Sequence, residues 1–213
     1  MSAASPHPRP ASTELEHLLE APLGLRERKK LKTRRAIRTA AFGLFAEQGY
    51  EATTVDQIAA VAEVSPSTFF RYFPTKEDLV ISDDYDPLLE AAFRARPKDE
   101  PVPQALRMAM VGPLRQVLAA ERDEMLLRME LYREVPAIRA RSMAEQQQTS
   151  ARLCRLIAER TGEDPSGLHL RVLVTTIIAA ASEAVLYWSE RGGVDDMTEL
   201  LDQALDVVIG PAS

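Results

Sequence analysis

Residues 53–79 read TTVDQIAAVAEVSPSTFFRYFPTKEDL, and this stretch decides the fold. Thr54 followed three residues later by Gln57 is a capping-box pattern, which predicts that a helix begins here. Ser65 directly before a proline is the N-cap pattern of a second short helix. Two short, sharply capped helices with a three-residue connection are typical of a helix-turn-helix, whose second helix lies in the major groove of DNA.

The second helix of this pair has a predicted inner and outer face. It must end near Phe73, because the residue before a proline disfavours helical dihedral angles. At about 100° per residue, Phe69, Phe70 and Phe73 form an apolar wedge that we expect to face inward. The expected outer face consists of Ser67, Thr68 and Arg71, with Tyr72 at its edge. Because arginine can bind guanine and hydroxyls contact bases or phosphates, this face favours DNA reading; a generic amphipathic helix is the alternative.

The charge of the chain is unevenly distributed. The 213 residues have a formal net charge of −6, which by itself argues against nucleic acid. Residues 26–38, however, hold eight Lys/Arg and one Glu, whereas residues 81–213 hold 15 basic and 22 acidic residues. A basic segment on an acidic body favours contact with an anionic polymer, and a solvated helix face is the alternative interpretation. Arg34 lies in this segment, which we expect to follow phosphates or to reach a minor groove.

The rest of the chain shows helical periodicity, with no convincing period-two strand. Apolar residues at helical spacing from Ile37 to Phe45 predict a first helix over residues 28–48, which Gly49 stops. Thr75 with Asp78 three residues later predicts a fourth short helix. Longer helices are expected over residues 103–120 (kinked at Pro113), 122–134, 136–161, 165–191, and from Asp195 or Asp196 to about Gly210.

We therefore predict an all-α protein in three parts: a disordered arm over residues 1–25, a helix-turn-helix DNA-binding domain over residues 26–80, and a helical regulatory and dimerisation domain over residues 81–213. The longest apolar run, residues 172–182, has 11 residues and is shorter than the roughly 18 of a membrane span. We expect a cytoplasmic protein without a membrane partner. One cysteine and three scattered histidines predict no internal disulfide, no metal site and no cofactor.

The sequence resembles the tetracycline-repressor (TetR) family. The resemblance lies in residues 53–59 and 64–79, together with Phe42, Phe45 and the Gly49-Tyr50 pair that ends the first helix. It implies a three-helix DNA-binding head on an all-helical regulatory domain that acts as a dimer. We combine the residues that the resemblance implies with those of the basic run and of the outer face. The resulting candidate DNA-contacting residues are Arg34, Thr54, Ser65, Ser67, Thr68, Arg71, Tyr72 and Lys76.

Three positions within the motif have implied individual roles. By the resemblance, Thr54 caps a helix whose N-terminus meets a phosphate, and Lys76 grips a phosphate, although it also fits an ordinary surface lysine. Phe70 departs from the family, which often has a tyrosine there whose hydroxyl touches a phosphate. Arg71 occupies a variable recognition position, so we expect it to contribute to the choice of operator.

The expected regulatory domain, residues 81–213, contains fewer recognisable sequence motifs than the DNA-binding domain. Residues 96–101 and 201–206 are similar to regulators linked with mycofactocin systems of actinobacteria. Methionines in consecutive helices suit either an adaptable ligand pocket or an ordinary core. The candidate ligand-binding residues are Met108, Met125, Met129, Tyr132, Glu183, Tyr187 and Trp188. The helix over residues 168–190 is apolar on most of its circumference and is expected to form a dimer seam with the last helix.

These patterns predict a dimeric DNA-binding transcriptional regulator: a repressor released from a palindromic operator by an apolar or amphipathic small molecule. A small helical enzyme and a protein-interaction adaptor without DNA affinity are the alternatives. The sequence contains no G-x-S-x-G, H-E-x-x-H, P-loop or G-x-G-x-x-G motif, so we expect no enzyme. The adaptor interpretation leaves the basic run and the polar recognition face without a role.

Overall fold

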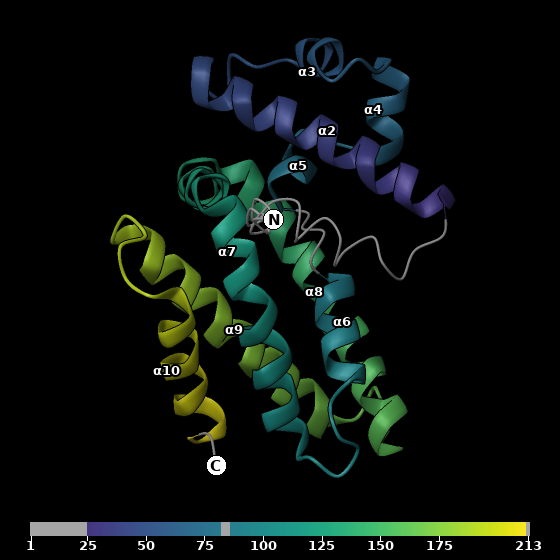
Figure 1. Ribbon diagram of the computed structural model, residues 1–213, viewed down its shortest axis with the longest axis vertical. Coiled ribbons are helices and arrows are strands. Elements are labelled where there is room, and N and C mark those ends of the chain that lie inside the picture. The colour runs from purple at the N-terminus through teal and green to yellow at the C-terminus, as the bar shows by residue number, and fades with distance from the viewer. Residues whose placement is uncertain (1–24, 82–85, 212–213) are drawn as a thin grey trace, which may run out of the picture.

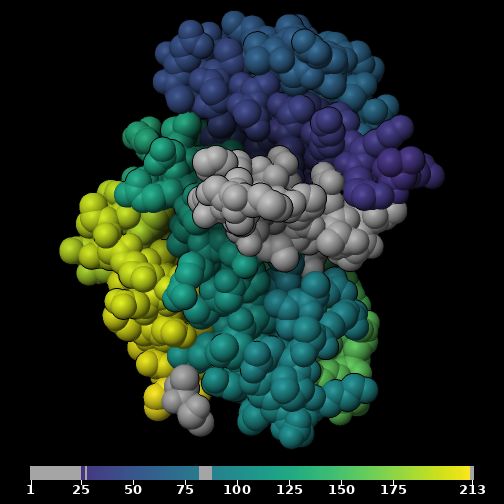
Figure 2. Space-filling model, viewed as in Figure 1, coloured from purple at the N-terminus to yellow at the C-terminus, as the bar shows by residue number. Residues whose placement is uncertain are grey.

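The computed structural model describes residues 25–81 and 86–211, which form helices and connecting loops with no strand among them. The predicted all-α fold is confirmed. A head of three helices lies across one end of a larger helical body (Figure 1), and Figure 2 shows the two as stacked lobes. The head consists of α2 (Leu25–Gln48), α3 (Val55–Val61) and α4 (Pro66–Tyr72). Of the arm expected over residues 1–25, all but Leu25 lies outside the described residues.

The body begins with two short helices and continues with four longer ones. The short helices are α5 (Glu77–Ile81), which follows the head directly, and α6 (Asp86–Arg94). Helix α6 was not predicted from the sequence as a separate helix. The longer helices are α7 (Val102–Glu134), α8 (Pro136–Thr161), α9 (Leu168–Glu190) and α10 (Met197–Ile209). In Figure 1, α9 and α10 run side by side along one flank, and α6 packs against α7.

An apolar core joins the three helices of the head. The predicted stripe of α2 is buried, with Ile37 and Phe45 among its members, and it meets Ile58 of α3. Phe69 and Phe73 from α4 and its C-cap complete this core, both with no exposed surface. Because each short helix contributes one or two large side chains, burial of those side chains holds the helix-turn-helix together.

Phe70 does not belong to the inward wedge that the helical plot predicts. Its side chain is 51% exposed, whereas Phe69 and Phe73 fill the space between α4 and α2. The Phe70 ring lies edge-on against Phe69, with the ring centroids 5.4 Å apart. A wedge of two phenylalanines is enough to anchor this two-turn helix, so the third aromatic ring remains on its outside.

Helix α7 is broken between the two segments that the sequence predicts, at a position different from the kink expected at Pro113. Glu121 has non-helical backbone angles (φ −134°, ψ 27°) between the two segments expected over 103–120 and 122–134. Pro113, the expected site of a kink, lies within regular helical backbone. The start of α9 also differs: Asp164 accepts a hydrogen bond from the Ser166 amide (2.9 Å) and forms a turn, so the helix begins at Leu168.

Helix α9 has one face in the body core and one face on the surface. Val174, Ile177 and Trp188 are buried among residues of α7, α8 and α10. The opposite stripe is exposed and consists of Leu168, Val172, Thr175, Ala179, Glu183 and Tyr187. By length and composition alone α9 is apolar enough to cross a membrane, but its inner face is occupied by neighbouring helices of the body.

Gly193 closes α9 in a conformation that only glycine adopts easily. Both Gly192 and Gly193 have a positive φ, of 71° and 69°, which L-residues with a Cβ disfavour. A Cβ on Gly193 would lie 2.9 Å from the Trp188 ring and 3.0 Å from Leu126, whereas a Cβ on Gly192 would meet nothing within 4 Å. The Trp188 indole is thereby held against the turn, and its Nε1 donates to the Asp195 carbonyl at 3.1 Å.

Substitution of these two glycines separates backbone strain from crowding. Gly192→Ala should lose about 1–2 kcal/mol of unfolding free energy through the positive φ alone. Gly193→Ala should lose roughly 1–3 kcal/mol more, because its methyl group displaces the buried Trp188 ring. Urea unfolding followed by circular dichroism measures both values. Equal losses for the two variants would show that the tryptophan adjusts without strain.

Candidate functional site

The turn before α3 is fixed by a reciprocal capping box, as predicted. The Thr54 hydroxyl accepts from the Gln57 amide at 3.3 Å, and the Gln57 side-chain oxygen accepts from the Thr54 amide at 2.9 Å. Gln48, at the end of α2, donates to the same Gln57 oxygen (3.2 Å) and to the Thr53 hydroxyl (3.1 Å). These bonds tie the start of α3 to the end of α2 and leave Thr54 on the exposed surface.

Three hydroxyl groups gather at the start of α4, the helix predicted to read DNA. Ser65 is the N-cap, and its Oγ accepts from the Thr68 amide at 3.1 Å. The same oxygen lies 2.9 Å from Ser67 Oγ and 3.0 Å from Thr68 Oγ1. Ser65 and Ser67 are exposed and Thr68 is half-buried, so the cluster presents hydrogen-bonding groups to solvent.

Arg71 and Tyr72 complete the outer face of α4. Arg71 is exposed, one turn beyond Ser67, and its guanidinium lies 5.3 Å from the centre of the Tyr72 ring. Tyr72 is half-buried, which is the border position that the helical plot predicts. Cationic and hydroxyl groups on one helical face can bind phosphates and the guanine edge in a major groove.

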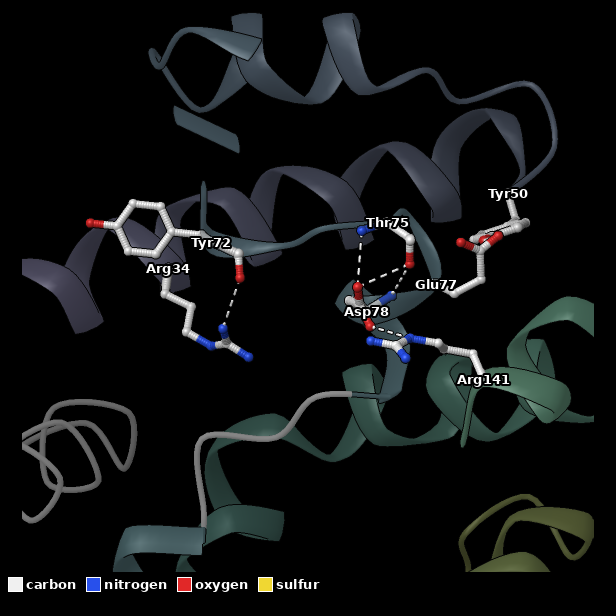
Figure 3. A network of polar contacts seen from close by, with 7 residues as sticks. All are labelled: Arg34, Tyr50, Tyr72, Thr75, Glu77, Asp78 and Arg141. Carbon is white, nitrogen blue, oxygen red and sulfur yellow. Dashed lines mark hydrogen bonds and ion pairs between the residues drawn. The ribbon is translucent and has the colours of Figure 1, made fainter. Parts of the chain in front are cut away.

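The Arg34 side chain forms contacts with other residues of the head. Its Nη1 donates to the Tyr72 carbonyl at 3.1 Å, as Figure 3 shows. The guanidinium also lies 4.4 Å from the centre of the Phe73 ring. Arg34 therefore satisfies a carbonyl at the end of α4 from α2, and so fixes the direction of the recognition helix.

Lys76 is likewise bound within the head. Its ammonium donates to the carbonyl oxygens of Tyr50 (2.8 Å) and Thr53 (3.2 Å), and it lies 4.0 Å from the centre of the Tyr50 ring. The Tyr50 hydroxyl lies 3.2 Å from a carboxylate oxygen of Glu77. Burial, followed by the negative charge of Glu77, raises the pKa of Tyr50, so the hydroxyl stays protonated and donates. Lys76 and Tyr50 thus hold the turn before α3 against the start of α5.

A buried polar contact directly after the head involves Asp78 of α5, which pairs with α8. Its Oδ2 accepts from the amide and the hydroxyl of Thr75, at 2.9 and 3.0 Å, which completes the second predicted capping box. Its Oδ1 accepts from Arg141 Nε of α8 at 2.9 Å, as Figure 3 shows. Asp78 is only 4% exposed, so its carboxylate oxygens need these donors in place of water. One carboxylate thus caps α5 and attaches it to the body.

The body contains an apolar cavity of about 450 Å³. Helices α5 to α10 all contribute to its lining, which includes Val80 and Ile81 of α5. Three predicted ligand residues line it: Met125, Met129 and Tyr132. Its other polar lining residues are Arg128, Ser142, Gln146 and Ser182.

The other four predicted ligand residues do not line this cavity. Met108, Glu183 and Tyr187 are exposed, because they lie on the outward faces of α7 and α9. Trp188 is buried, but it packs against the Gly193 turn rather than the cavity. Sequence reasoning missed Val80, Ile81 and Arg128, since nothing in a helical pattern tells which apolar face borders an empty space. Among the described residues, no group of three or more His, Cys, Asp or Glu side chains could hold a metal ion.

A helix-turn-helix with a polar outer face, set on a helical body with an apolar cavity, defines a DNA-binding regulatory protein. The family model "Bacterial regulatory proteins, tetR family" matches residues 37–82, and the model "MftR C-terminal domain" matches residues 100–212. The chain belongs to the TetR family of bacterial transcriptional regulators. Proteins of this family are not usually enzymes, and its regulators are dimeric and ligand-responsive.

Individual relatives agree with this assignment. The regulator TcmR of Streptomyces glaucescens is 34% identical over 197 residues, which cover 86% of this chain and 85% of the relative. The putative mycofactocin biosynthesis regulator MftR of Mycobacterium tuberculosis is 26% identical, covering 85% of this chain and 91% of the relative. The solved structure of the repressor FadR of Thermus thermophilus, in complex with lauroyl-CoA, is 26% identical with a TM-score of 0.55, and the match covers 84% of this chain and 95% of that one. The predicted similarity to mycofactocin-linked regulators is thus confirmed.

The Asp78 contact leads to a stability prediction. Asp78→Asn should lose about 1.5–3 kcal/mol of unfolding free energy, because it removes the charge that pairs with Arg141 and weakens a buried bond. Arg141→Met should then cause little further loss in that background. Asp196→Asn is the matched control, since Asp196 caps α10 through Thr198 and Glu199 without an ion pair in its capping contacts. Chemical denaturation measures all three, and equal losses for the two aspartates would contradict a special role of Asp78.

Proposed function

We propose that this regulator is a repressor whose two α4 helices bind the half-sites of a palindromic operator, and that an amphipathic molecule in the body cavity releases it. We further propose that it acts in the cytoplasm and catalyses no reaction. The observation that carries the proposal is the shared role of α5: it follows α4 directly, and its Val80 and Ile81 line the cavity.

We assign base reading to the exposed end of the α4 face. In this assignment the exposed Arg71 binds a guanine, and Ser67 and Thr68 contact bases or phosphates nearby. Thr54, Ser65 and Tyr72 lie at the edges of this surface and are assigned to the DNA backbone. Lys76 has three ammonium protons and uses two on carbonyl oxygens, so one remains for a phosphate. Arg34 acts indirectly, because it fixes the end of α4.

The cavity suits an effector with an apolar body. Its volume of about 450 Å³ lies within the range of small-molecule sites, and most of its lining is apolar. The complex of Thermus FadR with lauroyl-CoA supports an acyl or similarly amphipathic ligand. A ligand that displaces Val80 and Ile81 moves α5 and therefore α4. A tenfold loss of operator affinity requires only about 1.4 kcal/mol of preference for the released state.

The proposed dimer forms through the outer stripe of α9 together with α10. Apolar side chains on this stripe are exposed, with Leu168 at 77%, and Val207 of α10 is 86% exposed. Of the neighbouring alanines of α9, Ala180 packs toward the body core, whereas Ala179 faces outward. Small residues such as Ala179 allow close approach of a second α9.

Selection of binding sites from a random duplex library tests the DNA-reading role of Arg71. We expect wild-type protein to enrich a palindrome in which substitution of one guanine costs about 1–3 kcal/mol of binding free energy, measured by fluorescence anisotropy. In Arg71→Ala this penalty should disappear, while Arg155→Ala, which removes an exposed arginine of α8, should retain it. Failure to enrich any sequence would refute the operator-binding proposal. A uniform loss on all sequences would make Arg71 a phosphate contact.

The dimer proposal is tested by placing a charge on the seam. Ala179→Arg should convert the dimer into a monomer, because its long side chain does not fit where two α9 helices approach closely, even if it pairs with Glu183 one turn away. Ala144→Arg, at an exposed position of α8, is the matched control and should leave the dimer intact. Sedimentation velocity distinguishes the two species. A dimeric Ala179→Arg variant would place the interface elsewhere.

A further inference from the structure

The cavity contains one buried cation whose hydrogen bonding is incomplete. Arg128 lies on α7, lines the cavity and is 6% exposed. Its Nε is buried and has no hydrogen-bond partner. A buried N–H group without an acceptor is unfavourable, and a buried guanidinium is tolerated only when its charge is balanced. Arg128 therefore provides a donor for an acceptor that the protein itself does not supply.

The present partner of Arg128 occupies only part of its binding edge. Its Nη2 donates to Glu124 at 3.2 Å, one helical turn away on α7. A carboxylate usually binds the guanidinium through two parallel bonds, and Nε together with Nη2 forms such a pair. Since Glu124 engages Nη2 and leaves Nε unpaired, a second carboxylate could bind both donors and replace Glu124.

Glu124 is itself shared with the DNA-binding head. Its carboxylate lies 3.0 Å from Arg38 Nε of α2, and Arg38 also contacts Glu121 at the break in α7, at 3.4 Å. Burial is the main cause of the raised pKa of Glu124, so its charged form is disfavoured despite two neighbouring arginines. Arg128 also lies 5.8 Å from the centre of the Phe42 ring, which places it at the end of the cavity that faces the head.

We propose that Arg128 is the anion-binding group of the effector cavity, and that the effector is an apolar molecule that ends in a carboxylate. This inference rests on the proposed function and specifies its ligand. The apolar body fills the space between Met125, Met129 and Leu114, and the carboxylate accepts from Nε and Nη2 of Arg128. Glu124 then loses one of its two arginines, and the ion-pair network that joins α7 to Arg38 of the head changes with ligand binding.

Matched acid and alcohol probes test the proposal. The probes are dodecanoate with 1-dodecanol, and 1-pyrenebutyrate with 1-pyrenebutanol, each pair sharing one apolar body. We expect the acid to bind wild-type protein about ten- to a hundredfold more tightly than its alcohol in isothermal titration calorimetry, as a charge-assisted bond predicts. The acid should also lower operator affinity at lower concentration than the alcohol does.

Three variants test whether Arg128 causes the preference for the acid over the alcohol. In Arg128→Met the acid and the alcohol should bind within about twofold of one another, because only the anion loses a partner. Glu124→Gln removes the competing carboxylate, so it should tighten acid binding severalfold and leave alcohol binding unchanged. Arg115→Met, at an exposed position of α7 outside the cavity, removes the same charge and should keep the wild-type preference.

The possible results separate this inference from the proposed function. Equal binding of acid and alcohol by wild-type protein, or an acid preference that survives in Arg128→Met, would overturn the role of Arg128 while the amphipathic-effector proposal stands. If no probe of either kind binds, both proposals fail. Should Arg128→Met not fold, Glu124→Gln decides the question, since unchanged acid affinity in that variant would contradict competition for Arg128.

Discussion

The buried carboxylate of Asp78 is the contact on which the arrangement of head and body depends. It satisfies the amide and hydroxyl of Thr75 and simultaneously accepts from Arg141 of α8. Removal of a buried charge from water is unfavourable, so the carboxylate persists only where all these donors converge. Because Thr75 follows the recognition helix after two residues, this requirement fixes the position of α4 relative to α8 as well as the start of α5.

A second electrostatic connection joins the head to the body at α7. Arg38 reaches from α2 to Glu121 and Glu124, and Glu124 also pairs with Arg128 at the cavity. The head is thus held at two points, and residues of both α5 and α7 next to these points line the same cavity. The effector proposed above would contact Val80 and Ile81 on α5 and Arg128 on α7, each close to one of these two connections.

Local signals in the sequence were sufficient to locate the helices of the head and three of the helix caps. Thr54, Ser65 and Asp196 cap the predicted helices, because capping depends on residues only two or three positions apart. Features that depend on which other helices surround a given helix could not be predicted from the sequence. Phe69 and Phe70 are both phenylalanines on the predicted apolar side of the same short helix. Only the position of α2 decides that the Phe69 ring is buried and the Phe70 ring is exposed. Arg128 similarly fits a surface ion pair with Glu124 until the neighbouring helices enclose it.

In the dimer proposed above, the exposed stripe of α9 couples the stability of the fold to the amount of protein present. A single folded chain leaves Leu168, Val172 and Val207 largely in contact with water, so its folding recovers only part of the available hydrophobic free energy. A second chain that covers these side chains binds the folded form and not the unfolded one. By mass action, the folded state gains stability with each increase in protein concentration. For such a dimer, cellular abundance affects both operator occupancy and the stability of the fold.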